Sequence, residues 1–419
     1  MPSESSDGRR VVDQRALHLL NGRAGLHECG LTGARQFVGL LDDEITLPAL
    51  EPYVERRSTV QVGRTGPTHG DWMADGIMRS APGCRLVTAC PFDHHGLVFR
   101  GAIEAGMDSI RADDRVRLVN VSLEIRRTAR FCTEAAPCRA CMSLRRAVDD
   151  GWIVVVSAGN QAETSKSITC PAAESRGLVV AATTGPQGSS RLPADGPVHT
   201  ETGTSITAAM ITGAIASLMQ AFPTLAMDEL RDALAATSTR LPLAPPGSAG
   251  AGRPQFFRIM RYLQHGGRNG GYDVRAAETF ANDAVRGLSA HSAEHPIPDH
   301  TDDESAVARE LLERSVRLAP WSGELHLWLG LVLERHDRDA ALEAARESAR
   351  LDWSQPGVHD LFSRLLRLGG DELGADTELA VADRLRERDE LAAADALFDG
   401  MEARSSVART PDATQGPTT

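Results

Sequence analysis

Three side chains of different chemical type stand where they could act on one substrate. Asp42 follows the apolar stretch 37–41, His69 begins an apparent helix, and Ser205 precedes a long run of small and apolar residues. A serine hydroxyl is a weak nucleophile until an imidazole takes its proton, and a carboxylate fixes the tautomer of that imidazole and stabilises its charged form. These residue types, in this order along the chain, predict acyl transfer through a serine nucleophile.

Each of the three residues also has an ordinary structural interpretation. Ser205 could cap the first backbone N–H groups of a helix, His69 could be a cap or a packed core residue, and Asp42 could belong to a turn. With Asn160 between them, however, four segments follow in the order Asp, His, Asn, Ser, each in a fitting strand or helix context. The combination favours the catalytic interpretation over any single residue.

The elements that must position these residues alternate between apolar runs and amphipathic stretches. Continuous apolar runs are typical of strands that helices cover on both faces, and their alternation with helices predicts a doubly wound α/β fold with a mostly parallel sheet. The predicted strands are 37–41, 84–89, 116–123, 151–158 and 177–183, and the predicted helices include 138–150, 205–221 and 226–237.

Several ordered motifs resemble one known family. The segments VGLLDDEI, HGDWMADGI, LVNVSLE, VVVSAGN and GTSITAAM, within about residues 30–282, are similar to motifs of the subtilisin-like serine peptidases. The resemblance implies that Asp42 is the catalytic carboxylate, with Asp43 as second choice, that His69 is the general base and that Ser205 is the nucleophile. It also implies that Asn160 donates to the oxyanion. The substrate-binding residues that it implies are Ser122, Leu123, Glu124, Ser157, Ala158 and Gly159.

Two positions depart from the family pattern in ways that make predictions. Glu124 replaces a glycine at the end of the cleft motif, which predicts a preference for Arg or Lys before the cleaved bond; the alternative is that Glu124 faces solvent or pairs with Arg126 or Arg127. Ala209 stands where the family has a proline, from which we expect a rearranged or strained backbone in this stretch.

The chain is expected to contain two domains. A subtilisin-like domain is predicted over 13–285 and a linker over 286–303, and the predicted disordered ends are 1–12 and 406–419. Over 304–405 the segment RSVRLAPW (314–321) recurs as ESARLDWS (347–354), and small residues fall at 330 and 341. This all-α part resembles tetratricopeptide repeats, whose period is about 34 residues, and an irregular helical bundle is the alternative.

Composition restricts the compartment and the partners. The chain has 57 Asp and Glu residues against 45 Lys and Arg, a formal net charge of -12. Nucleic acid is thus not expected as a partner, because phosphate binding needs clustered positive charge. We find no apolar run of membrane-spanning length, and the polar start MPSESSDGRR lacks the apolar core of a signal peptide. We therefore expect a cytoplasmic protein, without a membrane partner and with reduced cysteines.

No metal or cofactor is assigned from the sequence. Cys132, Cys138 and Cys141 could form part of a structural zinc site or a redox-active pair, but no second Cys or His pair is close in sequence, so small buried thiols are the favoured interpretation. The run 93–95, Asp-His-His, is interpreted as a polar loop. Calcium is possible, but no acidic loop is distinct enough to assign it.

The sequence thus predicts a cytoplasmic serine endopeptidase that works through an acyl-enzyme. Its substrate is a peptide or protein, and its repeats are expected to bind a regulator or substrate protein. The alternative is a catalytically weak or inactive scaffold that acts through its repeats.

Overall fold

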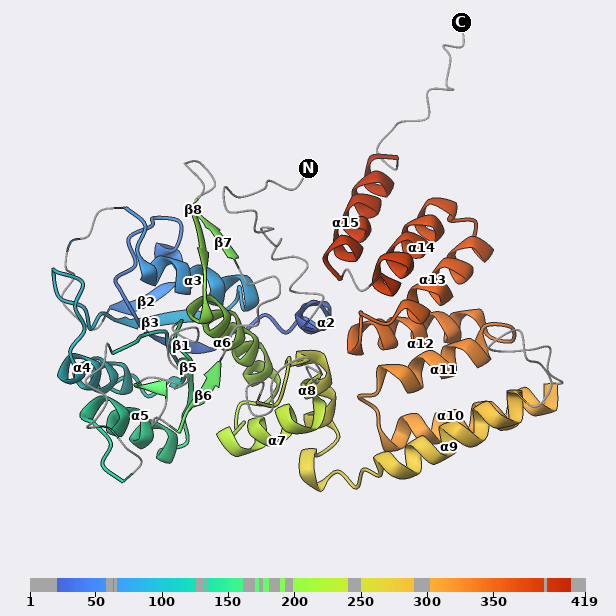
Figure 1. Ribbon diagram of the computed structural model, residues 1–419, viewed down its shortest axis with the longest axis horizontal. Coiled ribbons are helices and arrows are strands. Elements are labelled where there is room, and N and C mark those ends of the chain that lie inside the picture. Colours follow the sequence, from blue (N-terminus) through green and yellow to red (C-terminus); the bar gives the residue numbers. More distant parts are fainter. Residues whose placement is uncertain are drawn as a thin grey trace, which may run out of the picture. The chain divides into compact units, whose positions relative to one another are not determined.

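The computed structural model forms two compact units, which are described separately (Figure 1). One holds Leu26–Phe256, and the other holds Leu19–Gly25 with Phe257–Thr419. The residues described are 21–57, 63, 66–125, 132, 135–160, 170–172, 176–180, 189–192, 199–239, 250–289, 302–387 and 390–407. Residues 1–12, most of the predicted linker and 408–419 lie outside them, so the predictions for these segments stay predictions.

A six-stranded parallel sheet organises the first unit, which confirms the predicted fold class. Its strand order is β2-β3-β1-β4-β5-β6. The strands are β1 (Phe37–Leu41), β2 (Val54–Arg57), β3 (Arg85–Ala89), β4 (Val116–Val121), β5 (Ile153–Ser157) and β6 (Leu178–Val180). A separate antiparallel hairpin joins β7 (Ser189–Leu192) to β8 (His199–Thr202).

Helices cover both faces of this sheet (Figure 1). The helices α4 (Arg100–Arg111) and α5 (Arg139–Asp149) enclose an apolar core with the strand side chains that point toward them, among them Val119 and Val121 of β4. Since side chains alternate along a strand, Asn120 points to the opposite face, where it bonds to Thr212 of α6 (Thr204–Ala221). Helix α3 (His69–Ser80) packs beside α6, α2 (Arg23–Glu28) precedes the sheet, and α7 (Met227–Thr237) follows α6.

Helix α6 is the one helix among the described residues that is long and apolar enough, by these two criteria alone, to cross a membrane. Burial accounts for this apolar character, because 72% of the helix is buried inside the structure. The expectation of a disturbed backbone at Ala209 is wrong. Ala208 and Ala209 are fully buried within the helix, and an ideal Cβ on Gly76 of α3 would lie 3.0 Å from the Ala209 Cβ. Two small residues thus let α3 and α6 approach closely.

The second unit is helical throughout its described part. It contains α8 (Phe256–Gln264), α9 (Val274–Ser289), α10 (Asp302–Leu318), α11 (Gly323–Leu333), α12 (Arg338–Leu351), α13 (Pro356–Leu368), α14 (Glu372–Arg386) and α15 (Glu390–Val407). Gly330 of α11 packs tightly, since an ideal Cβ there would lie 2.9 Å from Leu361 Cδ2 and 3.4 Å from the Ala341 carbonyl oxygen. This agrees with the need for small residues at 330 and 341, while the assignment as tetratricopeptide repeats stays a prediction.

The boundary between the units lies before the predicted linker. Helices α8 and α9, which the sequence placed in the domain 13–285, belong almost entirely to the second unit. Ala277 and Ala281 of α9 pack in one apolar cluster with Ala308 and Leu312 of α10. The partner of such an amphipathic helix depends on packing, which its own spacing does not specify.

Candidate active site

The polar residues gather where the strand order reverses. Strands β2 and β3 lie on one side of β1, and β4, β5 and β6 lie on the other, so the chain changes direction between β3 and β4. In open α/β sheets, ligands bind at the carboxyl ends of the strands at such a switch point. Asp42 directly follows β1 and Ser122 directly follows β4, so the topology brings both residues to this place.

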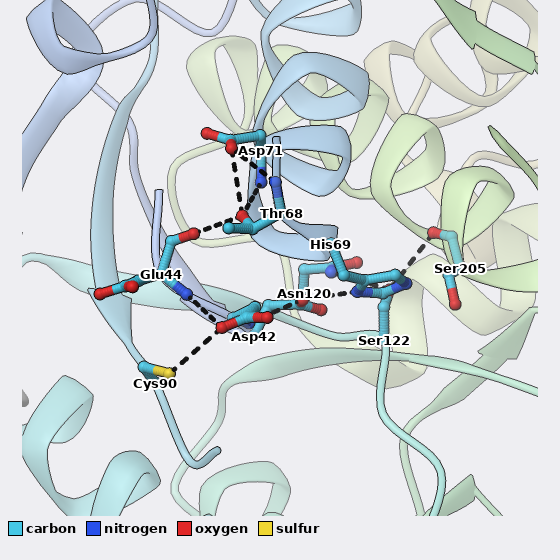
Figure 2. Close-up of polar contacts among 10 residues, drawn as sticks. Asp42, Glu44, Thr68, His69, Asp71, Cys90, Asn120, Ser122 and Ser205 are labelled. Carbon is cyan, nitrogen blue, oxygen red and sulfur yellow. Dashed lines mark hydrogen bonds and ion pairs between the residues drawn. The ribbon is translucent and has the colours of Figure 1, made fainter. Parts of the chain in front are cut away.

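Asp42 and His69 form a close pair (Figure 2). Asp42 Oδ1 lies 2.6 Å from His69 Nδ1, and the same oxygen accepts the Asp43 backbone N–H at 2.8 Å. The Asp42 side chain is fully buried, whereas that of His69 is 36% exposed. The short contact indicates that His69 Nδ1 donates to Asp42, which leaves Nε2 as the acceptor of the neutral ring. Asp43 instead faces the Cys90 thiol, with 3.7 Å between Oδ1 and Sγ.

The start of α3 positions His69. Thr68 and Asp71 form a capping box, in which the Thr68 hydroxyl accepts the Asp71 N–H and Asp71 Oδ2 accepts the Thr68 N–H. Asp71 Oδ1 also accepts the backbone N–H groups of Thr46 and Leu47, at 2.9 and 3.0 Å. This buried carboxylate therefore ties the loop after β1 to the helix that carries His69. The catalytic interpretation of the sequence did not include Thr68 and Asp71, although the spacing T-x-x-D was a signal for a helix start.

Ser205 is the second residue of α6, directly after a strained turn. Gly203 has φ 150° and ψ 176°, a conformation that is available essentially to glycine alone. A series of buried hydrogen bonds links this turn to strand β4. Ser122 Oγ donates to the Ser205 carbonyl at 3.2 Å and accepts from Asn120 Nδ2. Asn120 Oδ1 in turn lies 3.1 Å from Thr212 Oγ1. Figure 2 shows Asn120 and Ser122 between Asp42 and Ser205.

Asn160 joins the loop after β5 to the same turn. Its Oδ1 accepts the Thr204 backbone N–H at 3.0 Å and lies 3.1 Å from the Thr204 hydroxyl. The Thr204 hydroxyl in turn accepts the Gly159 N–H at 3.2 Å. Because Oδ1 is occupied in this way, the Asn160 amide group has its Nδ2 donor left for another acceptor. An ideal Cβ on Gly203 would lie 2.9 Å from this Nδ2, so the amide also requires glycine there.

The remaining predicted cleft residues lie on the ends of β4 and β5. Ser122, Leu123 and Ser157 are buried, and Glu124, Ala158 and Gly159 are partly exposed. Arg126 and Arg127, the alternative partners of Glu124, lie outside the described residues. Burial raises the pKa of Cys90, the thiol that faces Asp43, to about 11 and keeps it protonated near neutral pH, so it is a poor nucleophile there.

Part of this unit matches a known family. Residues 68–193 and 185–253 match the Subtilase family model (Peptidase_S8). The matched ranges contain His69, Asn160 and Ser205, whereas Asp42 lies before them. Residues 68–253 are thus similar to the subtilase family. No curated protein matches the sequence.

Solved structures of proteases also resemble the chain. The prenylagaramide maturation protease PagA is 15% identical with a TM-score of 0.46, covering 58% of this chain and 99% of its own. Fervidolysin from Fervidobacterium pennivorans, a keratinolytic enzyme related to subtilisin, is 19% identical with a TM-score of 0.46, over 62% of this chain and 48% of its own. A mutant of the PatA protease domain is 16% identical with a TM-score of 0.45, covering 56% of this chain and 98% of its own.

Proposed function

We propose that the protein is a serine endopeptidase in which Asp42, His69 and Ser205 form the catalytic triad and Asn160 binds the oxyanion. The observation that carries this proposal is the 2.6 Å contact between Asp42 Oδ1 and His69 Nδ1 at the switch point of the sheet. The buried carboxylate orients the partly exposed imidazole, and Nε2 is the nitrogen that would take the proton of the nucleophile.

The proposed reaction starts when Ser205 Oγ attacks the carbonyl carbon of the peptide bond. His69 Nε2 takes the hydroxyl proton, and Asp42 stabilises the resulting imidazolium. His69 then gives this proton to the leaving amine as the C–N bond breaks and the acyl-enzyme forms. Water, activated by His69 in the same way, hydrolyses the ester and restores Ser205.

Two donors would stabilise the negative oxygen of the tetrahedral intermediate. The backbone N–H of Ser205 belongs to the first turn of α6, where N–H groups have no partner within the helix and the helix dipole favours negative charge. Asn160 Nδ2 is the second donor, because Thr204 holds the amide oxygen on the other side. Preorganised donors of this kind lower the barrier of acyl transfer.

The proposal extends to the second unit and to the compartment. We assign to its helices the binding of a regulator or substrate protein. This assignment rests on the resemblance to tetratricopeptide repeats, with which the tight packing of Gly330 agrees. We place the activity in the cytoplasm, which the free thiols of all seven cysteines support.

A fluorophosphonate probe tests the nucleophile directly. The wild-type chain should be labelled, and mass spectrometry of the labelled peptide should place the adduct on Ser205. Ser205→Ala should not be labelled, whereas Ser109→Ala, on α4 outside the site, should be labelled like wild type. Wild type that is folded and still unlabelled would contradict the proposal and support a scaffold role.

A further inference from the structure

Four of the seven cysteines converge on one point of the first unit. The Sγ atoms of Cys132, Cys138, Cys141 and Cys170 all lie within 4.8 Å of one another. Cys141 is buried, and its Sγ lies 3.6 Å from that of Cys132 and 3.7 Å from those of Cys138 and Cys170. The other three thiols of this cluster are partly buried.

These distances fit four ligands of a single tetrahedral ion. A zinc ion binds thiolates at about 2.3 Å, which places neighbouring sulfur atoms about 3.8 Å apart. A disulfide would instead need two sulfur atoms about 2.05 Å apart and would join only one pair. Because Cys141 is nearly equidistant from three other thiols, pairing into disulfides does not explain the convergence.

The backbone around the cluster also favours thiolate ligands. Cys138 is the N-cap residue of α5 and Cys141 lies in its first turn, so both sulfurs stand at the positive end of the helix dipole. The Cys138 backbone N–H donates to Cys132 Sγ at 3.2 Å. This hydrogen bond would stabilise the negative charge of a thiolate at Cys132.

We propose that Cys132, Cys138, Cys141 and Cys170 bind one structural zinc ion. Four soft thiolate ligands in tetrahedral positions are typical of Zn²⁺, and they leave no coordination position for a substrate. Each thiol loses its proton to solvent as its Zn–S bond forms. The ion thus has a structural role and takes no part in the chemistry of Ser205.

The zinc site would stabilise the position of the segment that is expected to line the candidate cleft. Cys170 lies in the connection between β5 and β6, and its carbonyl accepts the backbone N–H of Ile125 at 3.0 Å. Ile125 directly follows Glu124, so the zinc ion would link α5 and this connection to the end of the cleft segment. The effect on peptide cleavage rests on the proposed function, whereas zinc binding does not.

Metal analysis of the purified full-length chain tests the site without any substitution. We expect one zinc ion per chain, and we expect Co²⁺ exchanged into the protein to give the visible absorption of a tetrahedral cobalt thiolate. A chain grown with zinc that contains none would overturn the proposal. Bound iron instead of zinc would also overturn the proposal. An intact mass that shows the loss of two hydrogens per disulfide among these cysteines would overturn it too.

Matched variants identify the ligands. Cys141→Ser and Cys170→Ser should lose the bound zinc, while Cys29→Ser, an exposed cysteine outside the cluster, should keep it. Retention of full zinc by folded Cys141→Ser and Cys170→Ser would contradict the assignment. Probe labelling in the same samples separates the two proposals: zinc without labelling contradicts the peptidase alone, and labelling without zinc contradicts the metal site alone.

Discussion

Gly70 lies so close to the backbone of Asp43 that an ideal Cβ atom at residue 70 would stand 2.0 Å from the Asp43 carbonyl oxygen. The obstacle is backbone, which cannot rotate away as a side chain can. Gly70 follows His69 and Asp43 follows Asp42, so this contact sets the distance between the two residues of the candidate pair. The first turn of α3 reaches the end of β1 because residue 70 has no side chain.

We therefore predict that Gly70→Ala lowers kcat although it removes no reacting group. The added methyl group must push the start of α3 away from the loop after β1, and a displacement of about 1 Å can cost about 100-fold in rate. Gly101→Ala is the control, because an ideal Cβ at that helical position meets nothing within 4 Å. Equal kcat values for Gly70→Ala and wild type would show that the contact does not control the pair.

Substitutions of the proposed reacting groups should lower kcat by amounts that depend on the role of each group. As members of the proposed triad, Ser205 and His69 should each be essential: Ser205→Ala and His69→Ala should each lower kcat by about 10⁶, the size of loss known for subtilisin, because triad members act as a unit. Asn160→Ala should lose about 10²–10³, since one of two oxyanion donors remains. Steady-state kinetics on a peptide substrate provides the comparison. An active Ser205→Ala protein would exclude Ser205 as the nucleophile.

The buried series of hydrogen bonds that links Thr212, Asn120, Ser122 and Ser205 should contribute to the stability of the fold. Thr212→Val keeps the shape of the side chain but removes the hydroxyl, which lies 3.1 Å from Asn120 Oδ1 and 2.8 Å from the Ala208 carbonyl oxygen. A buried polar group that loses its partner costs about 1–3 kcal/mol. We expect chemical denaturation to show a loss of that size in the free energy of unfolding. Thr207→Val on the same helix is the control, because the contact of its hydroxyl with the Gly203 carbonyl oxygen is long, at 3.4 Å. Equal losses of unfolding free energy in Thr212→Val and Thr207→Val would show that the contact between Thr212 and Asn120 has no special role in stability.

Local patterns predicted the parts of the molecule whose signal lies within a few residues. The five apolar runs appear as β1, β3, β4, β5 and β6, and the three stretches expected to be helical appear as α5, α6 and α7. Strand β2 was not predicted, because its sequence VERR has three charged residues and it lies at the edge of the sheet. An edge strand has less need of apolar side chains on both faces.

Contacts between distant segments could not be predicted in the same way. Cys170 is 29 residues from Cys141, so the cluster looked like three cysteines without a fourth ligand. The contact between Asn120 and Thr212 spans 92 residues and depends on how α6 crosses β4. Both contacts follow from packing of the sheet and its helices, which no short segment encodes.

The last prediction concerns the specificity of the cleft. Glu124 is partly exposed between the buried residues Leu123 and Ile125, at the end of the segment that is expected to line the pocket for the residue before the cut. A carboxylate in a partly desolvated pocket gains from a basic partner, and a hydrogen bond between charged groups contributes about 1.5–3 kcal/mol. Wild type should therefore cleave peptides with Arg before the cut faster than matched peptides with Leu, by about 10-fold or more in kcat/KM.

Glu124→Gly should lose this preference, because it removes the charge and opens space for an apolar side chain. Glu104→Gln, a charge change on α4 outside the cleft segment, should keep the wild-type ratio. If Glu124→Gly and wild type show the same Arg-to-Leu ratio, the Glu124 carboxylate does not contact the substrate side chain.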